Sequence, residues 1–282
     1  MFRIFIFFIF IGFSSVTKAH LLDYLLGESF YYKLHYQGTY SLNKKLFVAN
    51  IKVSTKPQYV ILPNGEKALD SRLDITTARS KFAEMLYPLR FHIRSLYQLT
   101  NPRLILLEKY KKVRKRLRHA LFIADGKGTI VRYRADKLNP KKPPLPKIIQ
   151  KWLGINTQFR LYSQNKEKIA PQALDQLSLI NLFRTLNLAQ GQCQLFPITS
   201  GKIAFKYTIC GAGKTLLQLA HKKQAAIQLK LTATELKKGK IITSHAPLNV
   251  WLSDNKKRIP LRFSMQDSTG LYQIDLISHN LN

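Results

Sequence analysis

The amino-acid sequence predicts a mainly β protein with roughly ten antiparallel strands and one or two short helices. Three observations lead to this prediction. Apolar and polar residues alternate in many short stretches from residue 30 onward, which is the period of a strand with one buried face. Glycine, proline and asparagine separate these stretches, as expected for turns. The spacing of three and four that is typical of a helix is clear only in residues 74–99 and 171–188.

The N-terminal residues predict a secretory signal peptide over residues 1–19. Arg3 gives a positive start, residues 4–13 are an apolar run of ten, and residues 14–19 form a small, polar approach to a cleavage site after Ala19. The apolar run is shorter than the roughly 20 residues that a membrane-spanning helix needs. We therefore expect residues 20–282 to form a single exported β-rich domain. An uncleaved anchor is the alternative.

The first part of the expected domain reads as strands and one helix. Residues 30–40 alternate aromatic and polar side chains, and residues 46–55 form a second predicted strand. Residues 56–69 contain Asn64 and Gly65 and predict a loop or a hairpin tip. Residues 74–99 have apolar side chains at helical spacing, but Pro88 would break a helix, so we expect a short helix followed by a strand.

Residues 104–123 fit two patterns that have different consequences for function. As a strand, the segment places Arg114, Arg116 and Arg118 on one face and apolar residues on the other. As a helix, it has an apolar stripe with a basic back, which is typical of binding to a membrane surface. The turn at 125–128, followed by alternation over 129–133, favours strands.

The second part begins with a connection and a helix. Residues 135–150 contain four prolines and four lysines, which predicts an exposed connection without a helix or a central strand. Residues 171–188 predict the clearest helix, because Pro171 suits a first turn and apolar residues follow at helical spacing. Alternation over 203–209 and 227–233 predicts further strands.

The C-terminal residues 247–277 predict three consecutive antiparallel strands. The first carries Trp251, the second covers residues 258–266, and polar turns at 253–255 and 267–270 separate them. In the last strand, alternation predicts that Tyr272, Ile274 and Leu276 point inward.

Two cysteines are present, Cys193 and Cys210. In an oxidising compartment they can form a disulfide across the turn at 199–201. The alternative is a pair of buried thiols that behave as small apolar side chains.

The chain is strongly basic, with 46 Lys and Arg against 15 Asp and Glu and a formal net charge of +31. A field of this sign favours anionic partners, such as lipid headgroups, acidic polymers or nucleic acid. Residues 109–118 include seven basic residues, among them Arg114, Arg116 and Arg118, and predict a basic surface. The expected export argues against nucleic acid as the partner in vivo. Lysine drift on the surface is the alternative explanation.

No motif predicts catalysis, a metal site or a cofactor. Residues 211–215 (GAGKT) resemble the end of a phosphate-binding loop, but Thr208 stands where that loop needs its first glycine. A tight glycine turn is the better interpretation. Seven histidines are scattered singly, and Ser253 beside Asp254 is a turn pair rather than a nucleophile with its base. We therefore expect no enzyme, no metal and no cofactor.

Several short motifs stand out at 250–254, at Arg258, Pro260 and Leu261, at Gly270, at 36–38, at Asp175, Ser178 and Arg184, and at the glycines 211–213. Together they resemble domain-of-unknown-function family 3108. Asn255 departs from the aspartate expected there. The resemblance covers most of the chain from about residue 30 and implies an exported bacterial protein of the periplasm with a curved antiparallel sheet and few helices. It implies no activity.

With this resemblance, we expect an incomplete barrel or clam of strands whose open side is plugged by helices. Such a barrel leaves an apolar concavity, so the first hypothesis is non-enzymatic binding or carriage of a lipid-like or glycolipid-like anion. A cavity lined by Phe, Leu and Ile with a basic rim would support this hypothesis, and a core filled by side chains would contradict it. The alternative is a periplasmic structural or assembly factor that docks on an acidic partner or on the anionic membrane surface.

The C-terminal motif supplies the candidate ligand-binding residues Trp251, Arg258 and Arg262. The two arginines can line the mouth of a cavity and bind an anionic headgroup. The structural interpretation is that Trp251 fills the open side of the sheet, while Asp254 caps the turn and pairs with Arg258.

Overall fold

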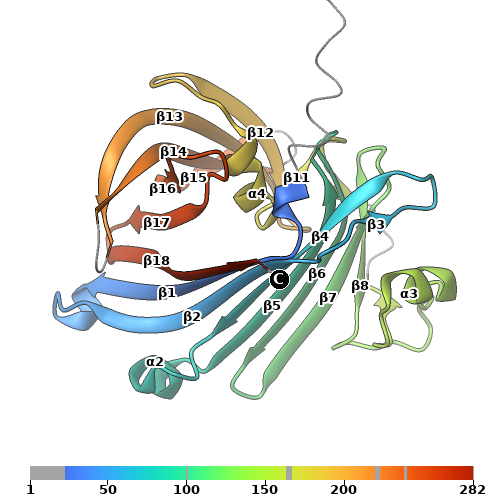
Figure 1. Cartoon of the computed structure of the whole chain (residues 1–282). Helices are drawn as coiled ribbons and strands as arrows, with labels where there is room; N and C mark the ends of the chain where they lie inside the picture. Colours follow the sequence, from blue (N-terminus) through green and yellow to red (C-terminus); the bar gives the residue numbers. More distant parts are fainter. Residues whose placement is uncertain (1–22, 100, 163–166, 220–222, 238–239, 282) are drawn as a thin grey trace, which may run out of the picture.

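The described residues form one large curved sheet that bends into an open, barrel-like ring (Figure 1). The computed structural model describes residues 23–99, 101–162, 167–219, 223–237 and 240–281, so the predicted signal peptide lies outside the described residues. The predicted class is confirmed: the fold is mainly β, and it is not closed into a barrel. The described part of the chain has 18 strands and three α-helices, which is more of each than expected.

The N-terminal wall of the ring is an antiparallel sheet in chain order, from β1 to β8. Short strands β3, β9 and β10 extend it at β4 and at β8. The bounds are β1 (Glu28–Gly38), β2 (Leu46–Thr55), β3 (Val60–Ile61), β4 (Lys67–Thr76), β5 (Leu89–Gln98), β6 (Arg103–Val113), β7 (Arg116–Ala124), β8 (Thr129–Arg134), β9 (Arg160–Leu161) and β10 (Glu167–Lys168).

The C-terminal wall continues from the other edge of β1, which pairs with the last strand, β18. From there the strands run back through the sequence to β12, and β11 adds to β12 in parallel. The bounds are β11 (Leu174–Asp175), β12 (Cys193–Thr199), β13 (Ala204–Gln218), β14 (Lys223–Lys237), β15 (Lys240–Ser244, paired with the end of β14), β16 (Leu248–Ser253), β17 (Pro260–Gln266) and β18 (Gly270–Leu281).

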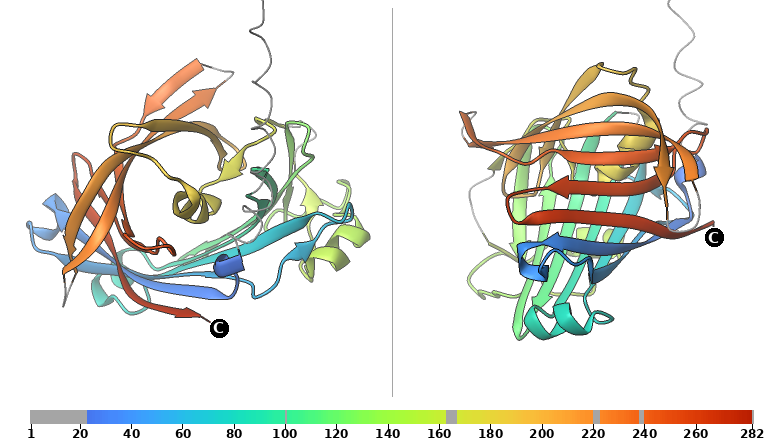
Figure 2. Two further views of the ribbon diagram at one scale, coloured as in Figure 1. Left: turned by 45° about the horizontal axis from the view of Figure 1, so that its top comes forward. Right: turned by 90° about the vertical axis from the view of Figure 1, so that its left-hand side faces the viewer.

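The helices occupy three different places. Figure 2 shows α4 (Ser178–Thr185) inside the ring, whereas α3 (Lys147–Leu153) lies outside it and α2 (Lys81–Leu86) lies at one end of the strands. Two single turns of 3-10 helix, η1 (Asp23–Leu25) and η2 (Thr39–Ser41), flank β1. No helix in the described ranges is long and apolar enough to cross a membrane.

Several predicted elements are confirmed. Residues 46–55 form β2, and α2 followed by β5 matches the predicted helix and strand on either side of Pro88. Residues 104–123 are strands rather than a helix, but a turn at Arg114, with φ of 51°, divides them into β6 and β7. The predicted helix at 171–188 is shorter than expected, because Leu174 and Asp175 form β11.

The prediction of an exposed connection without a helix at residues 135–150 is only partly right: most of the segment is exposed, but its end is helical and one of its side chains is buried. Leu145 is fully buried, and α3 begins at Lys147. The apolar groups of this segment pack with Leu121 and Phe159 on the outer face of the N-terminal wall. Proline cannot donate hydrogen bonds to a strand ladder. The segment packs on the sheet without forming a ladder, apart from one isolated bridge between Pro144 and Arg160.

The glycine-rich segment and the cysteines lie together at the end of the C-terminal wall. Residues 211–215 continue β13 through a bulge between Gly211 and Gly213, so the segment is neither a phosphate-binding loop nor a turn. Gly211 is required for close approach, because a Cβ there would lie 2.3 Å from the carbonyl oxygen of Ala189. Cys193 and Cys210 face each other across β12 and β13 and are joined by a disulfide.

The main apolar core fills the middle of the ring. Leu182 and Phe183 of α4 pack in one cluster with Phe122 of the N-terminal wall and Val250 of the C-terminal wall, and all four are nearly inaccessible. Burial of each such side chain contributes about 1.5–3 kcal/mol. Ile274 and Leu276 pack against the same cluster, as predicted. The expected open apolar concavity is therefore filled by α4 and by core side chains, which contradicts carriage of a ligand in the middle of the ring. The pockets described below lie outside this packed core.

Candidate functional site

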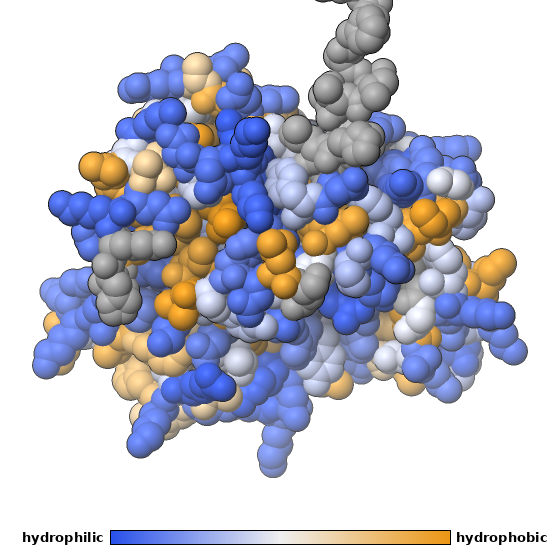
Figure 3. Space-filling model, viewed as in Figure 1, coloured by the Kyte–Doolittle hydropathy of each residue, from blue (hydrophilic) through white to orange (hydrophobic). Residues whose placement is uncertain are grey.

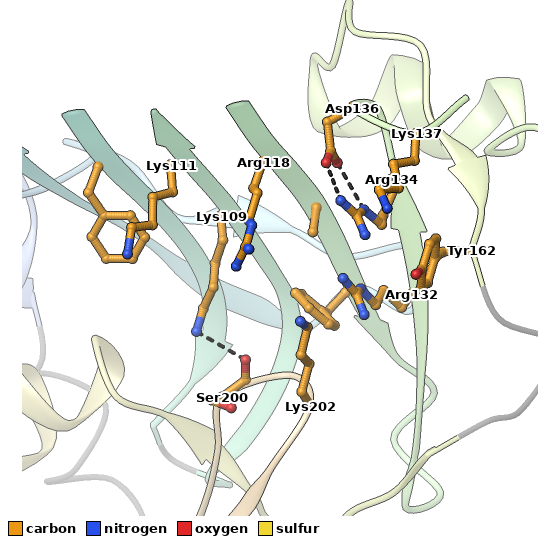
Figure 4. A pocket seen from close by; sticks show the side chains of 13 residues that line it. Lys109, Lys111, Arg118, Arg132, Arg134, Asp136, Lys137, Tyr162, Ser200 and Lys202 are labelled. Atoms are coloured by element: carbon orange, nitrogen blue, oxygen red, sulfur yellow. Dashed lines mark hydrogen bonds and ion pairs between the residues drawn. The ribbon is translucent and has the colours of Figure 1, made fainter. Parts of the chain in front are cut away.

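A pocket of about 450 Å³ opens on the inner face of the N-terminal wall (Figure 4). We call it the basic pocket. It has seven cationic side chains and one carboxylate among its lining residues. The cations are Lys109, Lys111, Arg118, Arg132, Arg134, Lys137 and Lys202, the carboxylate is Asp136, and Phe91, Ala120, Phe122, Tyr162 and Ser200 complete the lining.

Strand register explains why so many cations share one face. Ala120 of β7 lies between Lys109 of β6 and Arg134 of β8, and Phe122 lies opposite Arg132. Side chains directly opposite each other in neighbouring strands point to the same face of a sheet. Each of the three strands places an apolar core residue on this face and continues with cations toward one end: Leu107, Lys109 and Lys111 in β6, Phe122, Ala120 and Arg118 in β7, and Ile130, Arg132 and Arg134 in β8.

The loop between β12 and β13 forms the opposite side of the pocket. Lys109 Nζ donates a 3.0 Å hydrogen bond to the carbonyl oxygen of Ser200 in this loop. Gly201 has φ of 84°, and a Cβ there would lie 2.7 Å from the ring of Phe122. Glycine therefore allows the loop to pack directly on the floor of the pocket. Burial lowers the pKa of Lys109, and the pKa of Lys202 is lowered by burial and by the nearby charges of Arg132 and Arg134.

One cation of the pocket is already paired. Arg134 Nε donates a 2.9 Å hydrogen bond to Asp136, and a second nitrogen of the same guanidinium also contacts this carboxylate. Burial alone would raise the pKa of Asp136, but the hydrogen bonds from Arg134 and from the His119 amide outweigh it and hold the pKa below its usual range. The pair is therefore ionised and positions the Arg134 guanidinium.

Arg132 differs from Arg134 in its partners. Its Nε is buried and makes no hydrogen bond among the described residues. Its guanidinium lies over the ring of Tyr162 at 4.5 Å and over that of Phe122 at 5.6 Å, and Arg134 lies over the same tyrosine ring at 4.6 Å. Burial and the charge of Arg134 lower the pKa of Arg132. Asp136 and Glu167 offset this lowering only in part. Two guanidinium groups thus lie over one ring, and an added anion would stabilise them.

A second group of charges, which we call the Arg184 cluster, lies in the core. Arg184 and Glu28 are both fully buried and form an ion pair, and Arg184 Nε donates to the carbonyl oxygen of Lys257 at 3.0 Å. The guanidinium lies over the rings of Tyr24 and Phe30, at 4.8 and 5.3 Å. The cluster joins α4 to β1 and to the turn before β17, so its role is structural.

The other polar residues of the α4 segment have similar roles. Asp175 accepts hydrogen bonds from Ser95 Oγ and from the Leu177 amide, the latter at 2.8 Å, and Ser178 caps the same turn. Asn181 donates to the hydroxyl of Tyr97 at 2.6 Å. The residues Asp175, Ser178 and Arg184, which the sequence resemblance singled out, therefore hold α4 in the ring.

The structure brings two of the three predicted ligand-binding residues together, Trp251 and Arg262, but on the outer face of the sheet. Trp251 and Arg262 lie opposite each other in β16 and β17, on the face away from the core residues Val250 and Leu252. Arg262 is paired with Asp275, with an Nε to Oδ1 distance of 2.5 Å. Trp251 packs against a small separate cluster rather than the open side of the ring.

Arg258 lies apart from both, at a second pocket of about 540 Å³ near the end of α4. Its guanidinium donates to Asn187 at 3.1 Å, whereas Asp254 pairs with Lys214 at 2.8 Å. The predicted pairing of Asp254 with Arg258 is therefore wrong. The turn is capped by Asn255, whose Oδ1 accepts from the amides of residues 257 and 258.

The three arginines predicted as one basic surface are also separated. Arg118 lines the basic pocket, whereas Arg114 lies in the β6–β7 turn and donates to the Leu86 carbonyl oxygen at 3.1 Å. Arg116 is exposed beside that turn. Arg132, Arg134 and Lys202 were not among the binding residues predicted from the sequence. The signal for the first two was the series Ile130, Arg132 and Arg134, in which cations follow an apolar residue at strand spacing.

One of two similar solved structures supports the fold. A β-barrel-like protein of domain-of-unknown-function family 1849 from Brucella abortus is similar over 92% of this chain and 98% of its own length, with a TM-score of 0.50 at 9% identity. A Parabacteroides distasonis protein described as a "putative lipoprotein" matches with a TM-score of 0.36 at 8% identity, over 90% of this chain and 95% of its own.

Comparison with sequences identifies the family. No curated protein matches the chain. The model of the protein family of unknown function DUF3108 matches residues 32–277, which is nearly the whole chain. This match confirms the resemblance expected from the C-terminal motif and from the residues of α4. The chain belongs to the DUF3108 family.

Proposed function

We propose that this protein binds an amphipathic anion in the basic pocket and does not transform it. The observation that carries the proposal is Arg132, whose buried Nε has no partner among the described residues and whose nearest charged neighbours include Arg134. An anionic group placed between Arg132 and Lys202 would gain charge-assisted hydrogen bonds and relieve repulsion between cations.

The apolar lining supports an amphipathic ligand rather than a simple ion. Phe91, Ala120 and Tyr162 line the pocket with the cations, so the apolar part of a ligand can lie on these side chains while its charged group meets the guanidiniums. Binding without reaction is supported by the state of Asp136, which is the carboxylate of the pocket and is already held by Arg134. Among the described residues no cluster of His, Cys, Asp or Glu is arranged to hold a metal ion.

We place this binding outside the cytoplasm, in the periplasm. The apolar N-terminal segment followed by a small-residue cleavage site supports export. The disulfide between Cys193 and Cys210 also supports it, because disulfides persist mainly in oxidising compartments. Mass analysis of the protein from periplasmic extracts should give a chain that begins at His20 and carries no free thiol. A chain that begins at Met1 and carries free thiols would contradict export.

The first experiment identifies what the protein carries. Native mass spectrometry of the protein purified from cells, followed by organic extraction, should release one amphipathic anion per chain. Affinity is measured with two defined probes in separate titrations of the protein: dodecyl phosphate, kept below its micellar concentration, and inorganic phosphate. We expect dodecyl phosphate to bind more tightly, because the rings contribute through its alkyl chain.

The second experiment assigns the site. Changing Arg132 and Lys202 to Gln should weaken binding of dodecyl phosphate about tenfold or more, since each change removes a charge-assisted hydrogen bond. The matched control changes two exposed cations of the C-terminal wall, Lys206 and Lys230, to Gln and should leave the affinity unchanged. An equal loss in both double variants would indicate a general charge effect and contradict the assignment. No binding of either probe to the unchanged protein, with no extracted ligand, would overturn the proposal.

A further inference from the structure

At one end of the strands, α2 exposes several large apolar side chains. Of the six residues in this helix only Ala83 is buried, whereas Phe82, Met85 and Leu86 are 45%, 71% and 51% exposed. Tyr87, at the end of the helix, is 49% exposed. Adjacent exposed side chains of this kind mark surfaces that meet a partner or a membrane. The helix is held in place from below, because Ser80 caps it and donates to the carbonyl oxygen of Phe47 at 2.7 Å.

A strongly basic turn lies directly against this helix. The guanidinium of Arg114 donates to the Leu86 carbonyl oxygen at 3.1 Å, and Lys111 Nζ lies 5.8 Å from the centre of the Tyr87 ring. Lys112, Lys115 and Arg116 are exposed around the same turn. The carboxylate of α2 does not balance these charges, because Glu84 is already paired with Arg90 at 2.8 Å.

The β1–β2 turn extends this end of the molecule. Strand register places it at the same end of the sheet as α2 and the β6–β7 turn, and Figures 1 and 2 agree on this position. Tyr40 and Leu42 in this turn are 73% and 84% exposed. Figure 3 shows apolar atoms over α2 among the hydrophilic atoms that cover most of this view.

We infer that residues 81–87 and 111–117, which we call the docking rim, bind the surface of a membrane that contains anionic lipids. The cations of the turn would meet lipid phosphates, and the apolar side chains of α2 would insert among the headgroups. We prefer a bilayer to an acidic protein because the apolar side chains project outward from a short helix. The headgroup region of a bilayer can surround such projecting groups. The rim shares only Lys111 with the basic pocket, so it is a separate binding surface.

The test is co-sedimentation with vesicles of phosphatidylcholine alone and of phosphatidylcholine with one third phosphatidylglycerol. The full chain is expressed, and the protein that the cell accumulates is purified. We expect binding to the anionic vesicles that weakens with salt. Changing Met85 and Leu86 to Ser should lower the affinity about tenfold, and changing Lys112 and Lys115 to Gln should lower it and reduce its dependence on salt. All variants carry the same N-terminal residues, so differences between them report on the described surface.

The chain offers matched controls on the other side of the molecule. Ile148 in α3 is 78% exposed, and Lys141 and Lys147 are exposed nearby, so Ile148→Ser and the double change of the two lysines to Gln should leave vesicle binding unchanged. The pocket variant, with Arg132 and Lys202 changed to Gln, should still bind vesicles. Loss of binding in this variant would mean that the pocket recognises the lipid, and would overturn the proposal that the docking rim does. Equal binding by the rim variants and the unchanged protein would also overturn it, as would crosslinking of the rim to an acidic protein without any vesicle binding.

Discussion

Arg184 and Arg132 place the same guanidinium group over two aromatic rings, yet their surroundings are opposite. Arg184 is fully buried, and its nitrogens meet the carboxylate of Glu28 and a backbone carbonyl oxygen. Arg132 is partly buried in a pocket of like charges, and its Nε has no partner within the described residues. The partners of the two guanidiniums therefore indicate different roles. Arg184, whose nitrogens all have partners in the core, joins elements of the fold, whereas Arg132, whose Nε has none, is the residue that we propose for a ligand.

The largest effect should come from the same substitution made at both positions. Arg184→Met takes the guanidinium away from the fully buried carboxylate of Glu28 and leaves only the contact with His279, at 3.1 Å, so the free energy of unfolding should fall by about 3–5 kcal/mol. Arg132→Met should change it by less than about 1 kcal/mol, because no carboxylate loses its partner and repulsion from Arg134 is relieved. Urea unfolding of both variants measures the difference in the free energy of unfolding. Similar losses at the two positions would contradict the different roles of Arg184 and Arg132.

A double variant sharpens the result for the Arg184 cluster. Changing Arg184 to Met together with Glu28 to Leu removes both charges, and apolar replacements of a buried ion pair are often neutral. The double variant should therefore be more stable than Arg184→Met alone. If it is less stable, the pair itself stabilises the fold, rather than merely avoiding an unpaired charge.

An intermediate effect should appear as alkaline pH removes charge from the basic pocket. Burial lowers the pKa of Lys109 below the usual 10.5, so this lysine loses its proton earlier than an exposed one as pH rises. Binding of dodecyl phosphate should therefore weaken by up to about tenfold already below the usual lysine pKa of 10.5, in a range where the phosphate charge is constant. Titration at several pH values measures it, and Lys109→Gln should reduce the dependence. A flat profile in the unchanged protein would show that Lys109 does not contribute charge to binding.

The smallest effect should come from an exposed pair, Glu84 with Arg90. Hydrogen bonds from Arg90 and then from Thr77 hold the pKa of Glu84 at about 2, below its usual 4.5. Because the folded-state pKa is depressed, the stabilising contribution is present above pH 4.5 and is lost as pH falls toward 2. Glu84→Gln should lower the melting temperature by at most roughly 3 °C at pH 7 and by less at pH 3. An equal decrease at both pH values would show that the carboxylate charge is not responsible.

Local patterns predicted most strands, because alternation and turn residues act within a few positions of the sequence. They failed where contacts are long-range. The segment 171–188 has apolar residues at helical spacing, but pairing of Leu174 with β12 draws its start into a strand. At 135–150, the four prolines indicated an exposed segment, but Leu145 is buried against Phe159 and against the outer face of the N-terminal wall.

The candidate site could be predicted only in part, for a related reason. Both faces of the N-terminal wall carry apolar residues, since α4 covers one and the α3 segment covers the other. The series Ile130, Arg132 and Arg134 therefore indicates that these two cations share a face, but not that this face is the inner one. Trp251 and Arg262 were selected from a motif, but alternation with the buried residues Val250 and Leu252 already places both on the outer face.

The pairing of β1 with β18 has a consequence for the order of folding. The two strands come from opposite ends of the described chain, yet their ladder lies in the middle of the sheet and joins its two walls. Synthesis and the proposed export both deliver the N-terminal strand first, so one edge of β1 has no partner until the last strand has arrived. Contacts this distant in sequence slow folding, and an edge left open for that time can pair with other chains. A chaperone that shields strand edges would therefore protect the chain until β18 is in place.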